Sequence, residues 1–231
     1  MGGTGMVLAA AATFVGTHFL LSHPLRAPIV GRIGEGPFLG LYALVAAITL
    51  GWLAFAYRAV GPERPWWPVD DDFWIIATVL MLAASVLLIG SLLGNPAMPN
   101  PGTPGDLPDE ARGVFAVTRH PMMWSFALWG VSHILVSPIA SNLILCGAII
   151  LLALVGAALQ DRKKEALQPE RWRAWEAKTS YWPYAAVAAG RARLGGYRPH
   201  DVIGGVVLWL GATWAHTPLA GMPAGIWLWI G

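Results

Sequence analysis

Long runs without charged residues make up most of this chain, and short polar or basic stretches separate them. The uncharged runs cover residues 1–25, 36–57, 73–105, 120–160 and 202–231. A helix that crosses the hydrocarbon core of a bilayer needs roughly 20 apolar residues, and the fourth run is long enough for two such helices. The pattern therefore predicts six membrane-spanning helices, at about 5–22, 37–57, 74–93, 121–137, 139–160 and 203–220.

Proline and glycine mark the expected breaks between helices. Pro138 predicts the break inside the long fourth run, because proline lacks a backbone donor and clashes with the preceding turn. The stretch from Asn95 to Pro108 is rich in proline and glycine, which is typical of an irregular connection. The first run lacks the basic segment that precedes the apolar core of a secretion signal, so we expect it to remain as a helix. These features favour a single all-α domain over residues 1–231, a polytopic membrane bundle.

Composition agrees with a membrane protein. Of the 231 residues 56% are hydrophobic and 12% are charged, and the mean hydropathy is +0.55, which leaves too little polar surface for an ordinary soluble domain. The net charge of +2 gives no reason to expect a nucleic-acid partner, and the basic residues suit topology and contact with lipid headgroups. The single Cys146 is expected to be a small core residue.

Basic residues predict the orientation in the membrane. Nine of the fifteen lysines and arginines fall between residues 162 and 198, so this connection should face the cytoplasm. Alternation of six spans then places thirteen of the fifteen on that side and leaves Arg58 and Arg64 on the other. Both ends of the chain are expected on the side opposite the cytoplasm.

Two of the six histidines, His18 and His133, fall inside predicted helices, the first and the fourth. Ionisable side chains within a bilayer are costly and usually functional. Two interpretations remain open: neutral imidazoles hydrogen-bonded across the bundle, or ligands of a haem iron or another transition metal. No CxxCH motif is present, so any haem would be non-covalent, and zinc usually takes three or four protein ligands. The predicted boundaries offset the two residues by ~15 Å along the membrane normal, which helix tilt would reduce.

The cytoplasmic side carries two further features. The turn Arg119-His120-Pro121 opens the fourth helix, where it could hold an anion at the helix N-terminus or act as a positive anchor that sets topology. The stretch 161–176 alternates charged and aromatic residues and is expected to lie on the membrane surface. Glu165 and Glu176 in this stretch are expected to be solvated or salt-paired.

A set of motifs gives the chain a family resemblance. The motifs are Ser22-His23-Pro24-Leu25-Arg26-Ala27-Pro28, Gly34-Glu35-Gly36-Pro37-Phe38-Leu39-Gly40-Leu41-Tyr42, Asn95-Pro96, Arg112-Gly113, Thr118-Arg119-His120-Pro121-Met122-Met123-Trp124 and Leu128-Trp129 through His133. Together they resemble the NnrU family of bacterial membrane proteins. That resemblance implies a multi-pass protein of the bacterial inner (cytoplasmic) membrane, linked to denitrification and nitric-oxide metabolism.

The NnrU family is in turn related to 15-cis-zeta-carotene isomerase, a haem-b membrane enzyme of plants and cyanobacteria. This relationship implies haem b held by His18 and His133, between the first and fourth helices, with Phe126 and Trp129 beside a polyene. The turn at Arg119 and His120 completes the set of candidate cofactor-binding residues. The isomerase has a cysteine where this chain has Gly130, so a thiolate role is absent here.

Two other functions remain open. The Arg-His-Pro turn and the stretch from Glu165-Ala166-Leu167 to Trp172 and Trp175 are similar to the core of isoprenylcysteine carboxyl methyltransferases, which implies S-adenosylmethionine binding. A non-catalytic accessory protein for denitrification enzymes would need no cofactor. The expected partners are membrane lipids and either a polyene or nitric oxide, and the pattern leaves catalytic residues and oligomeric state open.

Overall fold

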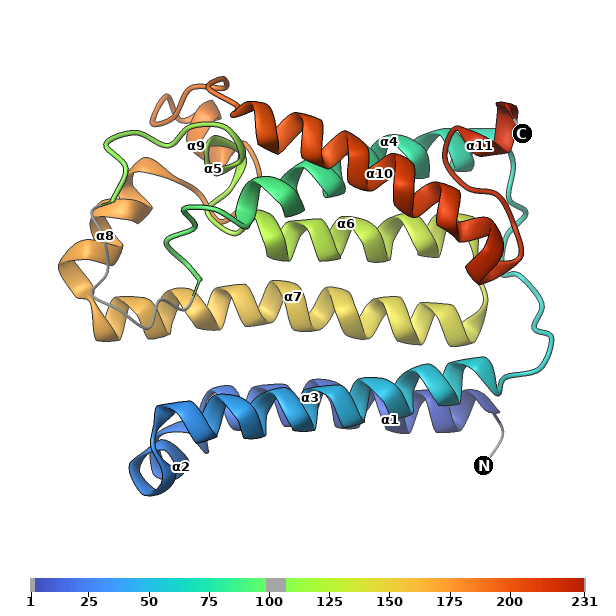
Figure 1. Cartoon of the computed structure of the whole chain (residues 1–231), viewed down its shortest axis with the longest axis horizontal. Helices are drawn as coiled ribbons and strands as arrows, with labels where there is room; N and C mark the ends of the chain where they lie inside the picture. Colours follow the sequence, from blue (N-terminus) through green and yellow to red (C-terminus); the bar gives the residue numbers. More distant parts are fainter. Residues whose placement is uncertain (1–2, 99–106, 231) are drawn as a thin grey trace.

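The computed structural model describes residues 3–98 and 107–230, and within these ranges it is built from helices without strands (Figure 1). The long helices are α1 (Gly3–Ser22), α3 (Glu35–Arg58), α4 (Asp71–Ser91), α6 (Pro121–Val136), α7 (Ala140–Leu167) and α10 (Pro199–Ala220). The shorter helices are α2 (Arg26–Ile33), α5 (Val114–Val117), α8 (Pro169–Lys178), α9 (Ala185–Ala188) and α11 (Trp227–Ile230). The middle of the irregular connection predicted from Asn95 to Pro108 lies outside the described residues.

The six long helices are those that the uncharged runs predicted. Five of them, α1, α3, α4, α7 and α10, are long and apolar enough to cross a membrane. The sixth, α6, has 16 residues, and its length of ~24 Å falls short of a hydrocarbon core of ~30 Å. The break at Pro138 is confirmed, since α6 ends at Val136 and α7 begins at Ala140. The chain is therefore an all-α, polytopic membrane bundle.

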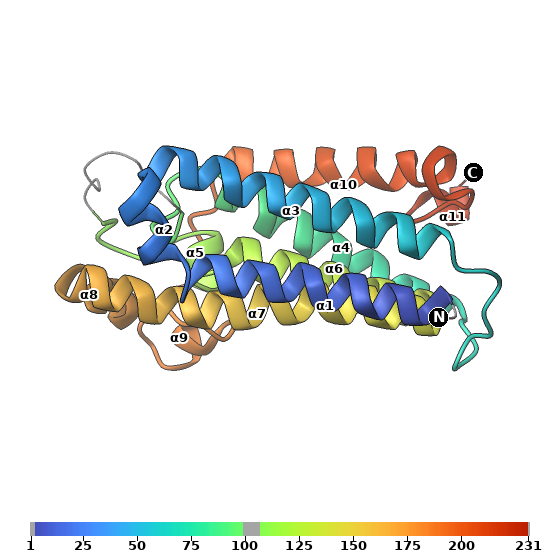
Figure 2. The same ribbon diagram turned by 90° about the horizontal axis from the view of Figure 1, so that it is seen from below.

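The long helices pack side by side in the order α3, α1, α7, α6, α4 and α10 (Figures 1 and 2). Glycines permit two of the close approaches. A Cβ atom on Gly205 of α10 would lie 2.7 Å from the Cα atom of Val86 in α4, and one on Gly130 of α6 would lie 2.7 Å from Cγ1 of Ile150 in α7. Small residues at such crossings let the backbones of membrane helices approach closely.

The two ends of the bundle differ in charge. One end carries α2, α5, α8 and α9, whereas the start of α1, the connection 59–70 and the end of α10 lie at the other (Figure 1). We call the first the basic end, because it holds the nine basic residues between 162 and 198 as well as Arg26 and Arg119. This separation agrees with the alternation that the sequence predicted. That the basic end faces the cytoplasm stays a prediction.

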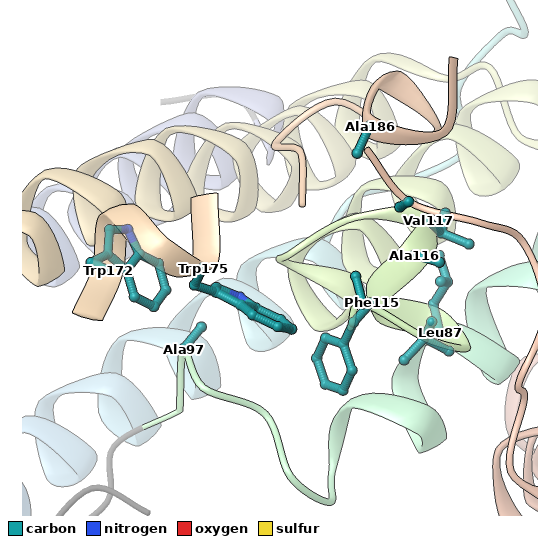
Figure 3. Packing of buried hydrophobic residues seen from close by; sticks show 11 residues of the cluster. Leu87, Ala97, Phe115, Ala116, Val117, Trp172, Trp175 and Ala186 are labelled. Carbon is teal, nitrogen blue, oxygen red and sulfur yellow. The ribbon is translucent and has the colours of Figure 1, made fainter. Parts of the chain in front are cut away.

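A cluster of aromatic and small apolar residues closes the basic end (Figure 3). Trp172 and Trp175 of α8 are 1% and 0% exposed, and the Trp175 ring meets the Phe115 ring with centroids 5.9 Å apart. These two tryptophans therefore pack against the protein, and the position of the stretch 161–176 on the membrane surface stays a prediction. Its first part extends α7 to Leu167, and α8 turns its tryptophans onto α5, because the protein itself supplies the apolar cover.

Candidate functional site

Two cavities lie among the long helices, and each contains one of the predicted histidines. The inner cavity, of about 460 Å³, lies toward the basic end between α1, α3, α6 and α7. His18 and Phe126 both line it. Nδ1 of His18 lies 2.7 Å from the Phe14 carbonyl oxygen, one helical turn back.

The inner cavity is apolar along its length and polar at the basic end. Its apolar wall includes Phe14, Phe19, Leu50, Met123, Phe126, Ile149 and Leu152. The polar end carries Ser22, His23, Gln160 and Lys163, and the Ser22 hydroxyl lies 2.7 Å from Nδ1 of His23. An apolar cavity with a few polar groups gathered at one end is the usual form of a small-molecule site.

The outer cavity, of about 760 Å³, lies toward the opposite end and is lined by α3, α4, α6, α7 and α10. His133 and Trp129 of α6 both line it, with ring centroids 4.3 Å apart. Nδ1 of His133 lies 2.8 Å from the Trp129 carbonyl oxygen. An Nδ1–H donor there fixes the tautomer, so Nε2 keeps its lone pair on the ring edge turned away from the helix backbone.

A second imidazole, that of His216 in α10, enters the same cavity. Its ring centroid lies 6.4 Å from that of His133, with an angle of 41° between the ring planes. Nδ1 of His216 lies 3.0 Å from the Met222 carbonyl oxygen. His216 lies near the end of the last predicted helix, 203–220, and no pattern in the sequence pairs it with His133.

The structure does not bring His18 and His133 together. The two line different cavities, His18 toward the basic end and His133 toward the other. The physical reason is depth along the bundle: Phe126 of α6 shares the inner cavity with His18, whereas His133 lies seven residues, ~10 Å, further along α6 and lines the outer cavity. The expected haem held by both histidines between the first and fourth helices therefore lacks support in this arrangement. The six candidate residues divide into His18 with Phe126, His133 with Trp129, and Arg119 with His120.

Arg119 and His120 lie in a buried charge cluster with Asp161 of α7 and Glu176 of α8. His120 is 2% exposed, and its Nε2 lies 2.7 Å from Oδ1 of Asp161. Arg119 donates from Nε to Oδ2 of Asp161 at 2.8 Å and pairs with Glu176 at 3.1 Å. Burial raises the pKa of the Glu176 carboxyl, and the Arg119 charge opposes that rise. The turn was expected either to hold an anion or to act as a positive anchor, and here Arg119 is paired with carboxylates of the protein itself. Neither Arg119 nor His120 lines the inner or the outer cavity.

The backbone around this cluster is also hydrogen-bonded. The Arg119 amide donates to the Ser180 carbonyl at 2.8 Å, and the Thr118 hydroxyl donates to the Tyr181 carbonyl at 2.8 Å. The Trp124 indole donates to the same Tyr181 carbonyl at 2.9 Å. These hydrogen bonds satisfy the irregular backbone before α6 and tie it to the segment 180–181 that follows α8.

Comparison with protein families identifies the family of the chain. A family model described as NnrU protein matches residues 6–224. The chain belongs to the NnrU family. The match runs from α1 to beyond α10 and includes the charge cluster and the lining of both cavities except Gly225. Comparison with curated proteins and with solved structures found no match.

Packing accounts for Gly130 in this NnrU protein. Its Cα faces α7, where an added Cβ would also lie 3.2 Å from the Cys146 carbonyl oxygen. A cysteine there would push the two helices apart. The lone Cys146 is 0% exposed and donates to Oδ1 of Asn142 at 3.3 Å, which confirms it as a core residue.

The donor set of this NnrU protein limits the kind of metal site it can hold. Within residues 3–98 and 107–230 no group of three or more histidine, cysteine, aspartate or glutamate side chains could hold a metal ion. A haem needs at most two axial ligands from the protein. One or two imidazoles in an apolar cavity therefore suit haem better than they suit zinc, which takes three or four protein ligands.

Proposed function

We propose that this NnrU protein binds haem b in the outer cavity, with Nε2 of His133 as an axial ligand. The observation that carries the proposal is the His133 ring itself. Its Nδ1 is engaged by the Trp129 carbonyl, and its Nε2 makes no hydrogen bond to the described residues around the cavity of about 760 Å³. Histidines that bind metals usually donate their second ring nitrogen to a carboxylate, a backbone carbonyl or water.

The remaining walls of the outer cavity fit the same group. The cavity lies within the range of roughly 300–1,000 Å³ common to ligand sites. Trp74, Met81 and Leu145 give it apolar faces, and Arg58 brings a cation to its mouth, where haem propionates would need a charge partner. Trp129 lies against the imidazole and restricts its rotation.

The two cavities follow one another along the same helices. On α6 Met123 and Phe126 line the inner cavity, and Trp129 and His133, one turn further on, line the outer cavity. A bound haem supplies a redox-active iron that can also act as a Lewis acid. The apolar inner cavity would hold an extended molecule beside it and exclude water. This arrangement supports cis–trans isomerisation of a polyene-type substrate as the activity.

The visible absorption spectrum tests the cofactor. Protein made with ample haem and purified in detergent is expected to show a Soret band, and His133→Ala is expected to lose or shift it. His18→Ala is the matched control: it also removes a membrane-depth imidazole but leaves the outer cavity intact, so its spectrum should match that of the unmodified protein. A colourless protein, or a His133→Ala spectrum identical to that of the unmodified protein, would refute the proposal.

Substrate assays separate the remaining functions. Haem-loaded protein is expected to convert a cis polyene, with the products resolved by chromatography, and Phe126→Ala should slow this conversion without removing the Soret band. Spectral change on nitric-oxide titration without conversion would favour nitric-oxide chemistry instead. Binding of S-adenosylmethionine that is lost in Arg119→Ala would favour a methyltransferase, although the Arg119 guanidinium is already paired with Asp161. A colourless protein that copurifies with denitrification enzymes would favour the accessory role.

A further inference from the structure

We infer that His216 of α10 supplies the second axial ligand of this haem, opposite His133. The inference rests on the proposed function, and it adds a residue that neither the family motifs nor the expected histidine pair contains. It also assigns the two ligands to α6 and α10, the fourth and sixth membrane helices, whereas the expected pair came from the first and fourth.

The imidazoles of His133 and His216 are oriented by the same kind of hydrogen bond. Nδ1 of His133 is engaged by a carbonyl at 2.8 Å and Nδ1 of His216 by a carbonyl at 3.0 Å. Each ring therefore keeps one basic nitrogen, Nε2, on its distal edge, and neither Nε2 bonds to another described residue. Both residues line the outer cavity. Two imidazoles that each hold Nδ1 on a carbonyl at one largely apolar cavity can bind one metal together, each through Nε2.

The spacing of the rings suits one metal centre. With metal–nitrogen bonds of ~2 Å, two imidazoles on opposite sides of one metal would have ring centroids about 6 Å apart. The observed separation between the His133 and His216 centroids is 6.4 Å. His18 is excluded from this role because it lines the other cavity.

The packing of α6 and α10 also bears on the His133–His216 pair. Both α6 and α10 pack against α4, so the pair joins two helices that a third already holds in register. The carbonyl that orients His216 belongs to Met222, in the turn after α10, where Gly221 adopts a left-handed conformation with φ 79°. This turn, rather than α10 alone, sets the direction of the second imidazole.

The spin state of the haem tests the inference separately from haem binding. The haem-loaded protein is expected to show the spectrum of a six-coordinate, low-spin haem with two imidazole ligands. His216→Ala is expected to retain haem, measured as pyridine haemochrome, and to show a five-coordinate, high-spin spectrum. Added imidazole should restore the low-spin spectrum, which a merely structural role of His216 would not produce. His18→Ala should leave the spin state unchanged.

Each failure has a different meaning. A colourless unmodified protein refutes the proposed function. A haem protein in which His133→Ala loses the Soret band but His216→Ala stays low-spin refutes the second ligand alone. An unmodified protein that is already high-spin also refutes it. If His216→Ala loses its haem and added imidazole does not restore a low-spin complex, His216 is needed for the shape of the cavity rather than as a ligand, and the inference fails.

Discussion

Nε2 of His120 lies 2.7 Å from Oδ1 of Asp161, and the two side chains are 1% and 11% exposed. Asp161 also receives the Arg119 guanidinium, so one carboxylate holds both residues of the Arg-His-Pro turn. This contact joins the start of α6 to the basic end of α7. The Arg-His-Pro turn therefore stabilises the packing of α6 against α7.

Asp161→Asn is expected to destabilise the protein by about 3 kcal/mol or more, because it leaves buried cationic groups without their carboxylate. Thermal unfolding in detergent, followed by tryptophan fluorescence, measures the change. Glu165→Gln is the control, since it breaks the exposed pair with Arg173 and should cost about 1 kcal/mol or less. Equal losses in the two variants would contradict the role of Asp161.

Glu176 should make the stability of the folded protein depend on pH. Burial raises the pKa of its carboxyl in the folded protein, and the nearby Arg119 opposes this. A group with a raised folded pKa holds its proton more tightly when folded, so its contribution to stability falls as pH rises through the window above the usual value of 4.5. Relative to Glu176→Gln, the unmodified protein should lose thermal stability between mildly acidic and neutral pH. Parallel pH profiles of the two proteins would rule this out.

Gly205→Ala should separate α4 from α10. The added Cβ would lie 2.7 Å from the Cα and 2.9 Å from the amide nitrogen of Val86, and backbone cannot move aside as a flexible side chain can. Such overpacking typically costs roughly 1–3 kcal/mol. Gly211→Ala in the same helix meets nothing within 4 Å and should have little effect on the melting temperature. If both variants melt alike, the close crossing of α4 and α10 is wrong.

Glu63→Gln should weaken the start of α7. The Glu63 carboxylate accepts from the Ser141 hydroxyl and, at 3.2 Å, from the Ser141 backbone amide in the first turn of α7. Negative charge at a helix N-terminus stabilises by roughly 0.3–1 kcal/mol, so a small drop in melting temperature is expected. Arg64→Gln, next in the chain, serves as the comparison and should melt like the unmodified protein.

Labelling of introduced cysteines checks the orientation. In a Cys146→Ser background, Arg64→Cys should react with a membrane-impermeant maleimide in intact cells, whereas Arg173→Cys should react only after permeabilisation. Both side chains lie outside the long helices, at opposite ends of the bundle. The reverse pattern would place the basic end outside the cell. Cys146 itself is 0% exposed and should resist the reagent in the native protein.

Sequence could predict the spans because bilayer thickness fixes the length of an apolar run. Each of the six predicted helices is present, and the boundaries differ by a few residues, except that α7 runs on to Leu167. The extension contains charged residues that end a hydropathy run but do not end a helix. Hydropathy reports where the chain leaves the lipid, whereas hydrogen bonding and packing determine where a helix stops.

The candidate site was predicted less completely, because depth along each helix is visible in the sequence but the order of helices is not. His133 and Trp129 share a cavity because they share a helix. His18 was paired with His133 by motif, but the two lie at different depths in the bundle and line different cavities. His216 and Asp161 were missed as partners because their contacts, with His133 and His120, join helices whose adjacency no single-sequence pattern reveals.

The turn at the start of α6 also bears on how the chain is assembled. Arg119 contacts Asp161, which lies 42 positions later in the chain. Thr118 contacts Ser180 and Tyr181, which lie 62 and 63 positions later. All three partners are therefore synthesised after α6 itself, which ends at Val136. The start of α6 thus stays incomplete until translation has passed residue 181, and a chain stopped before Asp161 would leave the Arg119 guanidinium without that carboxylate.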